Sequence, residues 1–289
     1  MHDESRLKEF LQGASKLPVL PKVTIRLLNA LDAPDTSARE IAGIIEAEPI
    51  LSARLLKLAN SSYYGQRGNI AKVNNAVAVL GSKTIRSLAL AIWTHTLKSQ
   101  TRKPEEMALM APLLAHGLAA GIAARMLAER VNQRLSEDAF MAGLLHDIGR
   151  VALVAQLGKE YQTLILDPAV REGVSLHEKE AEILGFDHRA LGSALMASWA
   201  LPPFLARVVE LHHDIVTVPG GASFFVSAVS LADSFATRLG FNLVLGGPQS
   251  MQENVAAFFW LNDEQAIAEF LETCMRWFRM MSEVLDKPK

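Results

Sequence analysis

The chain has 289 residues, half of them hydrophobic, with a formal charge of -2 and a sequence pI near 6.5. This composition excludes a disordered chain and supports a large buried core, in one domain or two lobes. The near-neutral charge gives no overall attraction to nucleic acid, so no nucleic-acid partner is expected. A single cysteine, Cys274, excludes an internal disulfide framework, and its apolar helical surroundings predict a buried thiol.

The first ten residues, MHDESRLKEF, contain no apolar run of the signal-peptide type, which favours a cytoplasmic protein. Two apolar stretches, 107–124 and 215–232, have the length of short membrane spans. The first is rich in Ala and Gly and contains Pro112 and His116, so it predicts a buried helix. The second is interrupted by a Pro-Gly-Gly sequence and predicts a turn followed by a helix. We therefore expect no membrane association.

Apolar residues recur with the helical period throughout the chain, which predicts an all-α fold. In the first lobe, Ser37 begins a capping-box pattern, SARE, and Pro49 suits the first position of another helix. Gly81 predicts a turn between two further helices, with Ser82 as a cap for the second. These helices predict an N-terminal helical lobe over residues 1–100.

A polar, charged stretch with one proline, KSQTRKPEE, marks the end of this lobe. The second lobe is predicted over 101–241, and GGPQS separates a C-terminal helical extension over 242–289. The second lobe is expected to contain helices near 106–130, 137–157, 188–200, 203–214 and 222–239. Ser136 is a candidate cap for the helix at 137–157.

Seven polar residues of the second lobe share helix faces with apolar residues. They are His116, His146, Asp147, His188, His212, His213 and Asp233. His116, for example, is in register with Leu109 and Leu113, and Asp233 is in register with Val226. Seven such groups without partners would destabilise a core strongly. A shared metal site would satisfy all of them, and His-Asp pairs hydrogen-bonded in a dry core are the alternative.

Neutral imidazoles and carboxylates bind iron, manganese, zinc and nickel, which the sequence does not distinguish. Adjacent positions on a helix point about 100° apart. The doublet His146–Asp147 therefore suits two metal ions, or a bridging role, better than chelation of one ion. We expect two divalent ions, an arrangement that can hold a bridging hydroxide and clamp a phosphate group.

Charged residues near this cluster are further candidates. Arg150 follows Asp147 by three positions and could meet a substrate phosphate, with a carbonyl cap or a surface ion pair as the alternative. Asp147 and Arg150 are thus the candidate catalytic residues. Glu178 and Glu182 lie four positions apart before His188, and either could join the site or belong to a solvent-exposed face.

The order of His116, the doublet His146–Asp147 and the distant Asp233 resembles the HD superfamily of metal-dependent phosphohydrolases. The blocks LPVLPKVTIRLLNAL, IIEAEPILSARLLKLANSSYYG and NNAVAVLGSKTIRSLAL resemble the HDOD family, the "HD-related output domain" of bacterial signalling proteins. GFDHRALGSALMASWALPPFLARVVELHH resembles the same family. The resemblance extends over residues 15–235.

This resemblance implies a two-lobe helical architecture and a signalling or regulatory role, exerted through a protein partner or a small phosphorylated ligand. His188, His212 and His213 resemble the additional ligands of the HD-GYP phosphodiesterases. The GYP signature is absent, because the chain continues IVTVPGGASFF after these histidines. Cleavage of cyclic dinucleotides is therefore not implied. The sequence shows no receiver or sensory domain, so we expect a stand-alone protein.

Five further residues are interpreted without a role in the site. His177 belongs to a charged stretch and is expected to face solvent, while His2 and His95 have no partner motif. Tyr63 and Tyr64 match a family block, and we expect them to pack the lobes together rather than to contact a ligand.

Three functions are compatible with these patterns. The first is a regulatory binding module with a retained metal site. The second is a metal-dependent phosphohydrolase acting on a nucleotide or another phosphoester. The third is a dinuclear iron site that senses oxygen or redox state, which uses the same ligands.

Overall fold

The computed structural model describes residues 3–61, 69–100, 103–214, 221–242 and 253–286. Every regular element within these ranges is a helix, which confirms the predicted all-α class. The chain divides into two compact units, each built from two separate segments. Unit 1 comprises Met1–Pro18 and Leu97–Met275, and unit 2 comprises Val19–Thr96 and Arg276–Lys289.

The predicted domain organisation stays a prediction. It divides the chain into lobes over 1–100, 101–241 and 242–289. In the structure the first residues group with unit 1 because helix α1 (Glu4–Gly13) is tied to it. The backbone N–H of Asp3, the N-cap of α1, donates to Gly185 O at 2.8 Å. A long-range contact of this kind has no signature in local sequence.

Unit 2 begins with three short amphipathic helices. They are α2 (Lys22–Asp32), α3 (Ala38–Glu46) and α4 (Pro49–Ala59). The predicted capping box is confirmed, since the Ser37 side chain accepts from Glu40 N and the Glu40 carboxylate accepts from Ser37 N. Pro49 occupies the predicted first position of α4. Helix α5 (Val73–Gln100) contains the predicted break at Gly81, whose φ of 73° interrupts the helix.

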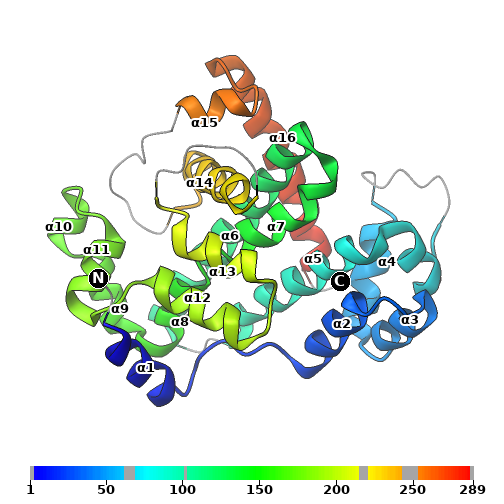
Figure 1. Ribbon diagram of the computed structural model, residues 1–289, viewed down its shortest axis with the longest axis horizontal. Coiled ribbons are helices and arrows are strands. Elements are labelled where there is room, and N and C mark those ends of the chain that lie inside the picture. Colours follow the sequence, from blue (N-terminus) through cyan, green and yellow to red (C-terminus); the bar gives the residue numbers. More distant parts are fainter. Residues whose placement is uncertain (1–2, 62–68, 101–102, 215–220, 243–252, 287–289) are drawn as a thin grey trace. The chain divides into compact units, whose positions relative to one another are not determined.

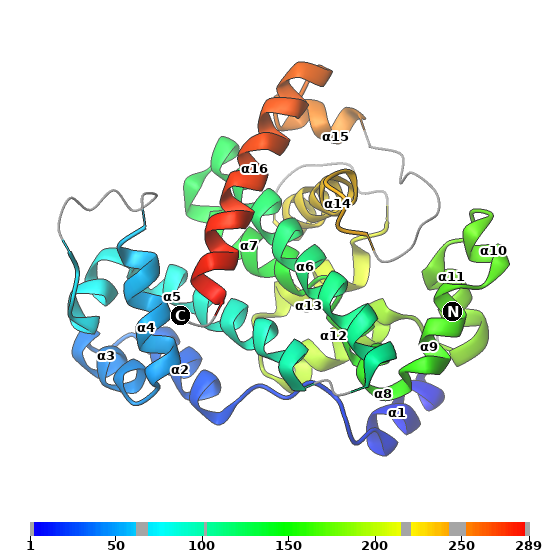
Figure 2. The same ribbon diagram turned by 180° about the vertical axis from the view of Figure 1, so that it is seen from behind.

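Unit 1 is built around α6 (Pro104–Val131), which runs beside α7 (Ser136–Leu145) and α14 (Ala222–Arg238) (Figure 2). Helices α12 (His188–Ser198) and α13 (Pro203–Leu211) lie side by side (Figure 1). The remaining elements of unit 1 are η1 (Gln133–Leu135), α8 (Ile148–Leu157), α9 (Lys159–Ile165), α10 (Pro168–Arg171), α11 (Leu176–Leu184) and α15 (Glu253–Phe258). Helix α16 (Glu264–Leu285) belongs to unit 1 up to Met275 and to unit 2 beyond it.

The predicted single helix at 137–157 is wrong, because the structure divides this segment into α7 and α8 at His146 and Asp147. Both halves are apolar on nearly every side, so the helical period continues through the break and conceals it. The predicted Ser136 cap is also wrong. Ser136 is the first residue of α7, and its hydroxyl donates to Gln133 O at 2.8 Å.

Two glycines that flank this break bring backbones into close contact. A Cβ built on Gly143 would lie 2.7 Å from Ala120 O, and one built on Gly149 would lie 1.8 Å from His188 O. Neither position can hold a larger side chain unless the backbone moves. The segment carrying His146 and Asp147 is therefore held tightly between α6 and α12.

Three segments of the described chain meet the length and hydropathy of a membrane-spanning helix. They are Val73–Ser99, Pro104–Val131 and Gln133–Leu157. In the second, which includes the stretch 107–124, 67% of the apolar window is buried within the protein, and in the third 78% is buried. The expected absence of membrane association stays a prediction.

Candidate metal centre

His146 and Asp147 lie in the turn between α7 and α8, and both side chains are buried. The other five predicted ligands come from four further places in unit 1. His116 lies in the middle of α6, His188 begins α12, His212 and His213 follow the end of α13, and Asp233 lies within α14. The structure brings all seven predicted metal ligands into one cluster.

The first ligand group consists of His116, His146 and Asp147, which each offer one ligand atom within 4.8 Å of the others. Asp233 borders this group. Its Oδ1 lies 3.0 Å from His116 Nε2 and 4.0 Å from His146 Nε2. His146 Nε2 is also 3.6 Å from Asp147 Oδ2. Two imidazoles and two carboxylates thus converge from α6, α14 and the turn after α7.

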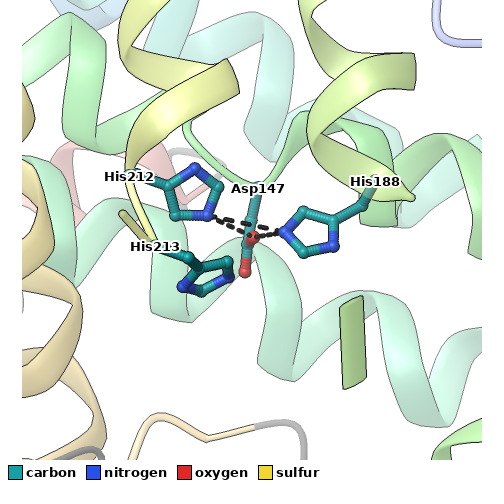
Figure 3. A group of neighbouring side chains, drawn as sticks. All are labelled: Asp147, His188, His212 and His213. Carbon is teal, nitrogen blue, oxygen red and sulfur yellow. Dashed lines mark hydrogen bonds and ion pairs between the residues drawn. The ribbon is translucent and has the colours of Figure 1, made fainter. Parts of the chain in front are cut away.

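The second ligand group consists of Asp147, His188, His212 and His213. Figure 3 shows Asp147 with His188 on one side and the His212–His213 pair on the other. Asp147 Oδ1 lies 3.4 Å from His188 Nε2 and 3.6 Å from His212 Nε2. The two Nε2 atoms are 3.5 Å apart. Asp147 therefore belongs to both groups, with its two oxygens turned toward different histidines.

Four of the histidines share one hydrogen-bonding arrangement, in which Nδ1 contacts an oxygen acceptor outside the cluster. His146 Nδ1 is 2.6 Å from Gly143 O, and His212 Nδ1 is 2.8 Å from Val209 O. The Nδ1 atom of His116 contacts a backbone carbonyl, and that of His188 contacts a buried carboxylate. Because these acceptors require a proton on Nδ1, the Nε2 atom of each ring carries a lone pair directed into the cluster when the imidazole is neutral.

Several buried atoms within the cluster have no hydrogen-bond partner in the described chain. They are His116 Nε2, His146 Nε2 and Asp147 Oδ1. The 3.0 Å contact between His116 Nε2 and Asp233 Oδ1 does not meet hydrogen-bond geometry. Buried polar atoms are normally satisfied, and imidazole nitrogens with carboxylate oxygens are the usual ligands of divalent transition metals. The residues present fit a metal ion.

The charges of the site also fit a cation. Asp147, Asp233 and Glu180 are buried carboxyl groups. Arg150 brings a positively charged guanidinium close to Asp147. When Asp147 and Asp233 are ionised and the histidines are neutral, these two carboxylates and Arg150 leave an excess of one negative charge, and ionisation of Glu180 adds a second. An excess of this kind in a low-dielectric interior is strongly unfavourable unless a cation balances it.

Burial lowers the pKa of His146 to about 4, against the opposing effect of Asp147. Burial and the Arg150 guanidinium hold the pKa of His188 well below its usual value. For His116, burial lowers the pKa, but Asp233 and Asp147 outweigh it and raise the pKa. His146 and His188 are therefore neutral near pH 7, the form that binds metals.

Arg150, the predicted phosphate-binding residue, extends from α8 into the cluster. Its Nη1 donates to Asp147 Oδ2 at 2.7 Å, and its Nη2 is 3.4 Å from His213 Nε2. Burial alone would raise the pKa of Asp147, but Arg150 and His146 lower it well below its usual value. The Arg150 side chain is 12% exposed, so it lies at the cluster rather than at the protein surface.

Of the two alternatives for Glu178 and Glu182, the structure supports the solvent-exposed face, but sequence reasoning missed a buried carboxylate between them. Glu178 and Glu182, the two candidates, are both exposed. Glu180, between them, is fully buried and contacts His188. The signal that could have found it is the helical register, since Leu176 and Leu184 lie four positions before and after Glu180 on the same helix face.

His177, expected to face solvent, is half-buried, and its ring stacks on His213 with centroids 5.0 Å apart. This expectation was wrong because the exposed stretch of α11 passes beside the residues after α13. His95 lies in unit 2, where it is 3.3 Å from Asp286. His2, Tyr63 and Tyr64 lie outside the described residues.

The HDOD domain model matches residues 17–215. The chain belongs to the HDOD domain family, which confirms the resemblance found in its motifs. A crystal structure of an HDOD domain protein of unknown function from Geobacter sulfurreducens has a TM-score of 0.77 and 26% identity, and the alignment covers 98% of each chain.

Two other solved structures share the fold. A protein named "Putative phosphohydrolase" from Shewanella amazonensis is 24% identical, with a TM-score of 0.73 and coverage of 98% of each chain. A protein named "Putative signal transduction protein" from Marinobacter aquaeolei is 21% identical, with a TM-score of 0.69, and the alignment covers 98% of this chain and 65% of that one.

An uncharacterized protein of Treponema pallidum is 22% identical over 266 residues, which make up 91% of this chain and 50% of that protein. The chain thus spans half the length of this curated relative.

Proposed function

We propose that this HDOD domain protein is a cytoplasmic bacterial signalling or regulatory protein that binds two divalent metal ions in the His/Asp cluster of unit 1. The first ion is held by His116, His146, Asp147 and Asp233. The second ion is held by Asp147, His188, His212 and His213. Iron, manganese, zinc and nickel all suit these ligands.

The observation that carries this proposal is the common orientation of the buried imidazoles. In His116, His146, His188 and His212, Nδ1 is engaged by an acceptor and Nε2 is directed into the cluster. A dry core of His-Asp hydrogen bonds would pair these Nε2 atoms with donors. Instead, His116 Nε2 and His146 Nε2 have no hydrogen-bond partner.

A regulatory role is supported by the family and by the distribution of chemistry in the chain. Both metal-binding groups lie in unit 1, and unit 2 has no such group among its described residues. The Marinobacter relative is named a signal transduction protein, and its chain is longer than the aligned part. We propose that this protein acts through a signalling partner or a small phosphorylated ligand, without nucleic acid or membrane.

Elemental analysis by plasma mass spectrometry tests the metal site. The protein is purified without an affinity tag or added metal, alongside Asp147→Ala and the control Asp35→Ala, which changes an exposed aspartate of unit 2. We expect about two equivalents of metal in the wild type and the control, and loss of both in Asp147→Ala, because Asp147 belongs to both groups. Absence of metal from the wild type, or unchanged metal in Asp147→Ala, would refute the proposal.

Phosphoester hydrolysis is the second candidate function, and the position of Arg150 favours it. Two bound metal ions would supply Lewis-acid activation of a phosphate group and of a water molecule. Arg150, 2.7 Å from Asp147, could bind the phosphate oxygens, and Asp147 would orient the guanidinium. Metal-loaded protein is assayed with a chromogenic phosphodiester. Activity that is lost in Arg150→Met while metal content is retained would support catalysis, whereas an inactive wild type would oppose it.

A further inference from the structure

Glu180 is a carboxyl group that neither ligand group contains, yet its side chain is fully buried. It lies in α11, between Glu178 and Glu182, which are exposed. Burial raises the pKa of Glu180 to about 7, although Arg150 and hydrogen bonds from Tyr161 and His188 oppose the rise. A leucine at this position would avoid the cost of desolvating a carboxyl group. The presence of Glu180 therefore indicates that its polar contacts have a role.

Three hydrogen bonds converge on the Glu180 carboxylate. Its Oε1 accepts from the Tyr161 hydroxyl at 2.5 Å. Its Oε2 accepts from the backbone N–H of His188 at 2.8 Å and lies 2.6 Å from His188 Nδ1. These contacts connect α9, α11 and the first residue of α12. All three side chains are completely buried, so water does not compete for the hydrogen bonds.

His188 differs from its neighbours in the chemistry of its Nδ1 acceptor. The Nδ1 atoms of His116, His146 and His212 contact backbone carbonyls. That of His188 contacts a carboxylate, which accepts a stronger, charge-assisted hydrogen bond. A carboxylate at this position fixes the tautomer and ring orientation of a metal-binding histidine and increases the basicity of its other nitrogen.

We propose that Tyr161 and Glu180 form a positioning relay for the second ligand group. Tyr161 orients the Glu180 carboxylate, and Glu180 keeps the proton of His188 on Nδ1, so that Nε2 is free to bind a metal. This inference rests on the proposed metal site. It concerns the group of Asp147, His188, His212 and His213, because Glu180 contacts His188, which belongs to that group alone.

Titration of the metal-free protein with Co²⁺, followed by visible absorption, tests the relay. The variants are Glu180→Gln, which keeps the size of the side chain, and Tyr161→Phe, which removes only the hydroxyl. Glu178→Gln is the matched control, because it removes the same charge from an exposed position of the same helix. Circular dichroism and thermal unfolding establish that each variant is folded.

We expect two ions to bind the wild type and Glu178→Gln with equal affinities. In Glu180→Gln the affinity for one of the two ions falls by about 10–100-fold, the range typical for loss of an outer-shell partner, while the other is unchanged. Tyr161→Phe shows a smaller loss at the same ion. Equal affinities in the wild type and Glu180→Gln would overturn the relay and leave the proposed metal site intact. A wild type that binds no Co²⁺ would instead refute the metal site.

A measurement on the unsubstituted protein keeps the relay testable if Glu180→Gln does not fold. Long-range ¹H–¹⁵N correlation spectra of the metal-free protein report which imidazole nitrogen carries the proton. The His188 signals are assigned by their loss in His188→Gln. We expect a proton on Nδ1 of His188 and an unprotonated Nε2. The opposite tautomer would overturn the relay.

Discussion

Asp147 and Asp233 contribute differently to the cluster, although both are buried aspartates. Asp147 belongs to both ligand groups, whereas Asp233 lies beside His116 and His146 only. For Asp233→Asn we expect one equivalent of metal in place of two, because the ligands His188, His212 and His213 are retained. Plasma mass spectrometry of the purified variant measures this directly.

Asp35→Asn is the control for this substitution, since it makes the same change at an exposed position. We expect it to retain both equivalents. If Asp233→Asn also retains two ions at wild-type affinity, Asp233 is not a ligand, and its contact with His116 is an internal ion pair.

Cys274 of α16 is 1% exposed, as predicted, and its Sγ lies 3.5 Å from Met126 Sδ. Burial raises the pKa of this thiol to about 12, although Arg130 opposes the rise. The nucleophilic thiolate is therefore scarce at pH 8. We expect no reaction with Ellman's reagent in the native protein over minutes and reaction of one thiol in guanidinium chloride. Rapid reaction of the native protein would show that α16 opens locally.

Residue types and spacing were sufficient to predict that these seven residues cluster, because polar and charged side chains on an apolar helix face need partners. Glu180 was missed because it stands between the charged residues Glu178 and Glu182, although it is in register with Leu176 and Leu184 on its helix. The burial of Glu180 depends on Tyr161 and His188, which approach from other helices. Contacts of this kind arise from tertiary packing, so the sequence does not indicate which residues a buried Glu180 meets.

At the scale of elements, most helices follow from their apolar period and their capping residues. The predicted helices at 106–130, 188–200 and 222–239 correspond closely to α6, α12 and α14. The break between α7 and α8 did not follow, because apolar residues surround it on both sides. His146 keeps helical backbone angles, whereas Asp147 does not, so the break falls at the second residue of the doublet, just before the start of α8.

A substitution at Gly149, just after the break, tests how closely α8 packs against α12. Gly149→Ala would place a Cβ 1.8 Å from the backbone oxygen of His188. Although alanine favours a helix by about 1 kcal/mol over glycine, relief of this clash requires a backbone shift. We expect a net loss of about 1–3 kcal/mol in the free energy of unfolding, measured by urea denaturation.

Gly43→Ala is the matched control, because Gly43 lies within α3 and a Cβ there meets no atom within 4 Å. This substitution should stabilise the protein by up to about 1 kcal/mol. A Gly149→Ala variant as stable as Gly43→Ala would contradict the close packing of α8 on α12.

For the whole molecule, the sequence predicted an all-α chain with helical lobes, and the family match agrees with the motifs that suggested it. It did not predict that each compact unit is made of two separate segments. Periodicity assigns residues to helices, but it carries no information about which distant helices share a core. The tie between Asp3 and Gly185 is one such long-range contact.

Metal binding should change the stability of unit 1 in particular, because all candidate ligands lie there. A ligand present at about 100 times its dissociation constant stabilises the native state by about 2.7 kcal/mol. For a unit of this size we expect an increase of roughly 5–10 °C in its unfolding temperature. Calorimetry of the metal-free protein, with and without added Mn²⁺ or Zn²⁺, measures the shift.

Asp147→Ala should show no such increase, and a chelator should reverse the increase in the wild type. The transition of unit 2 should not move. An equal shift in Asp147→Ala would indicate that the added metal acts elsewhere on the chain.

The interleaved order of the two units also affects how the chain folds during synthesis. Val19–Thr96 leaves the ribosome before Leu97–Met275, and Arg276–Lys289, the other segment of unit 2, follows that long segment. Unit 1, in contrast, has all its segments once Met275 has emerged. Unit 1 therefore has all its segments before unit 2 does, and Val19–Thr96 must wait for its partner segment while the long segment of unit 1 is synthesised.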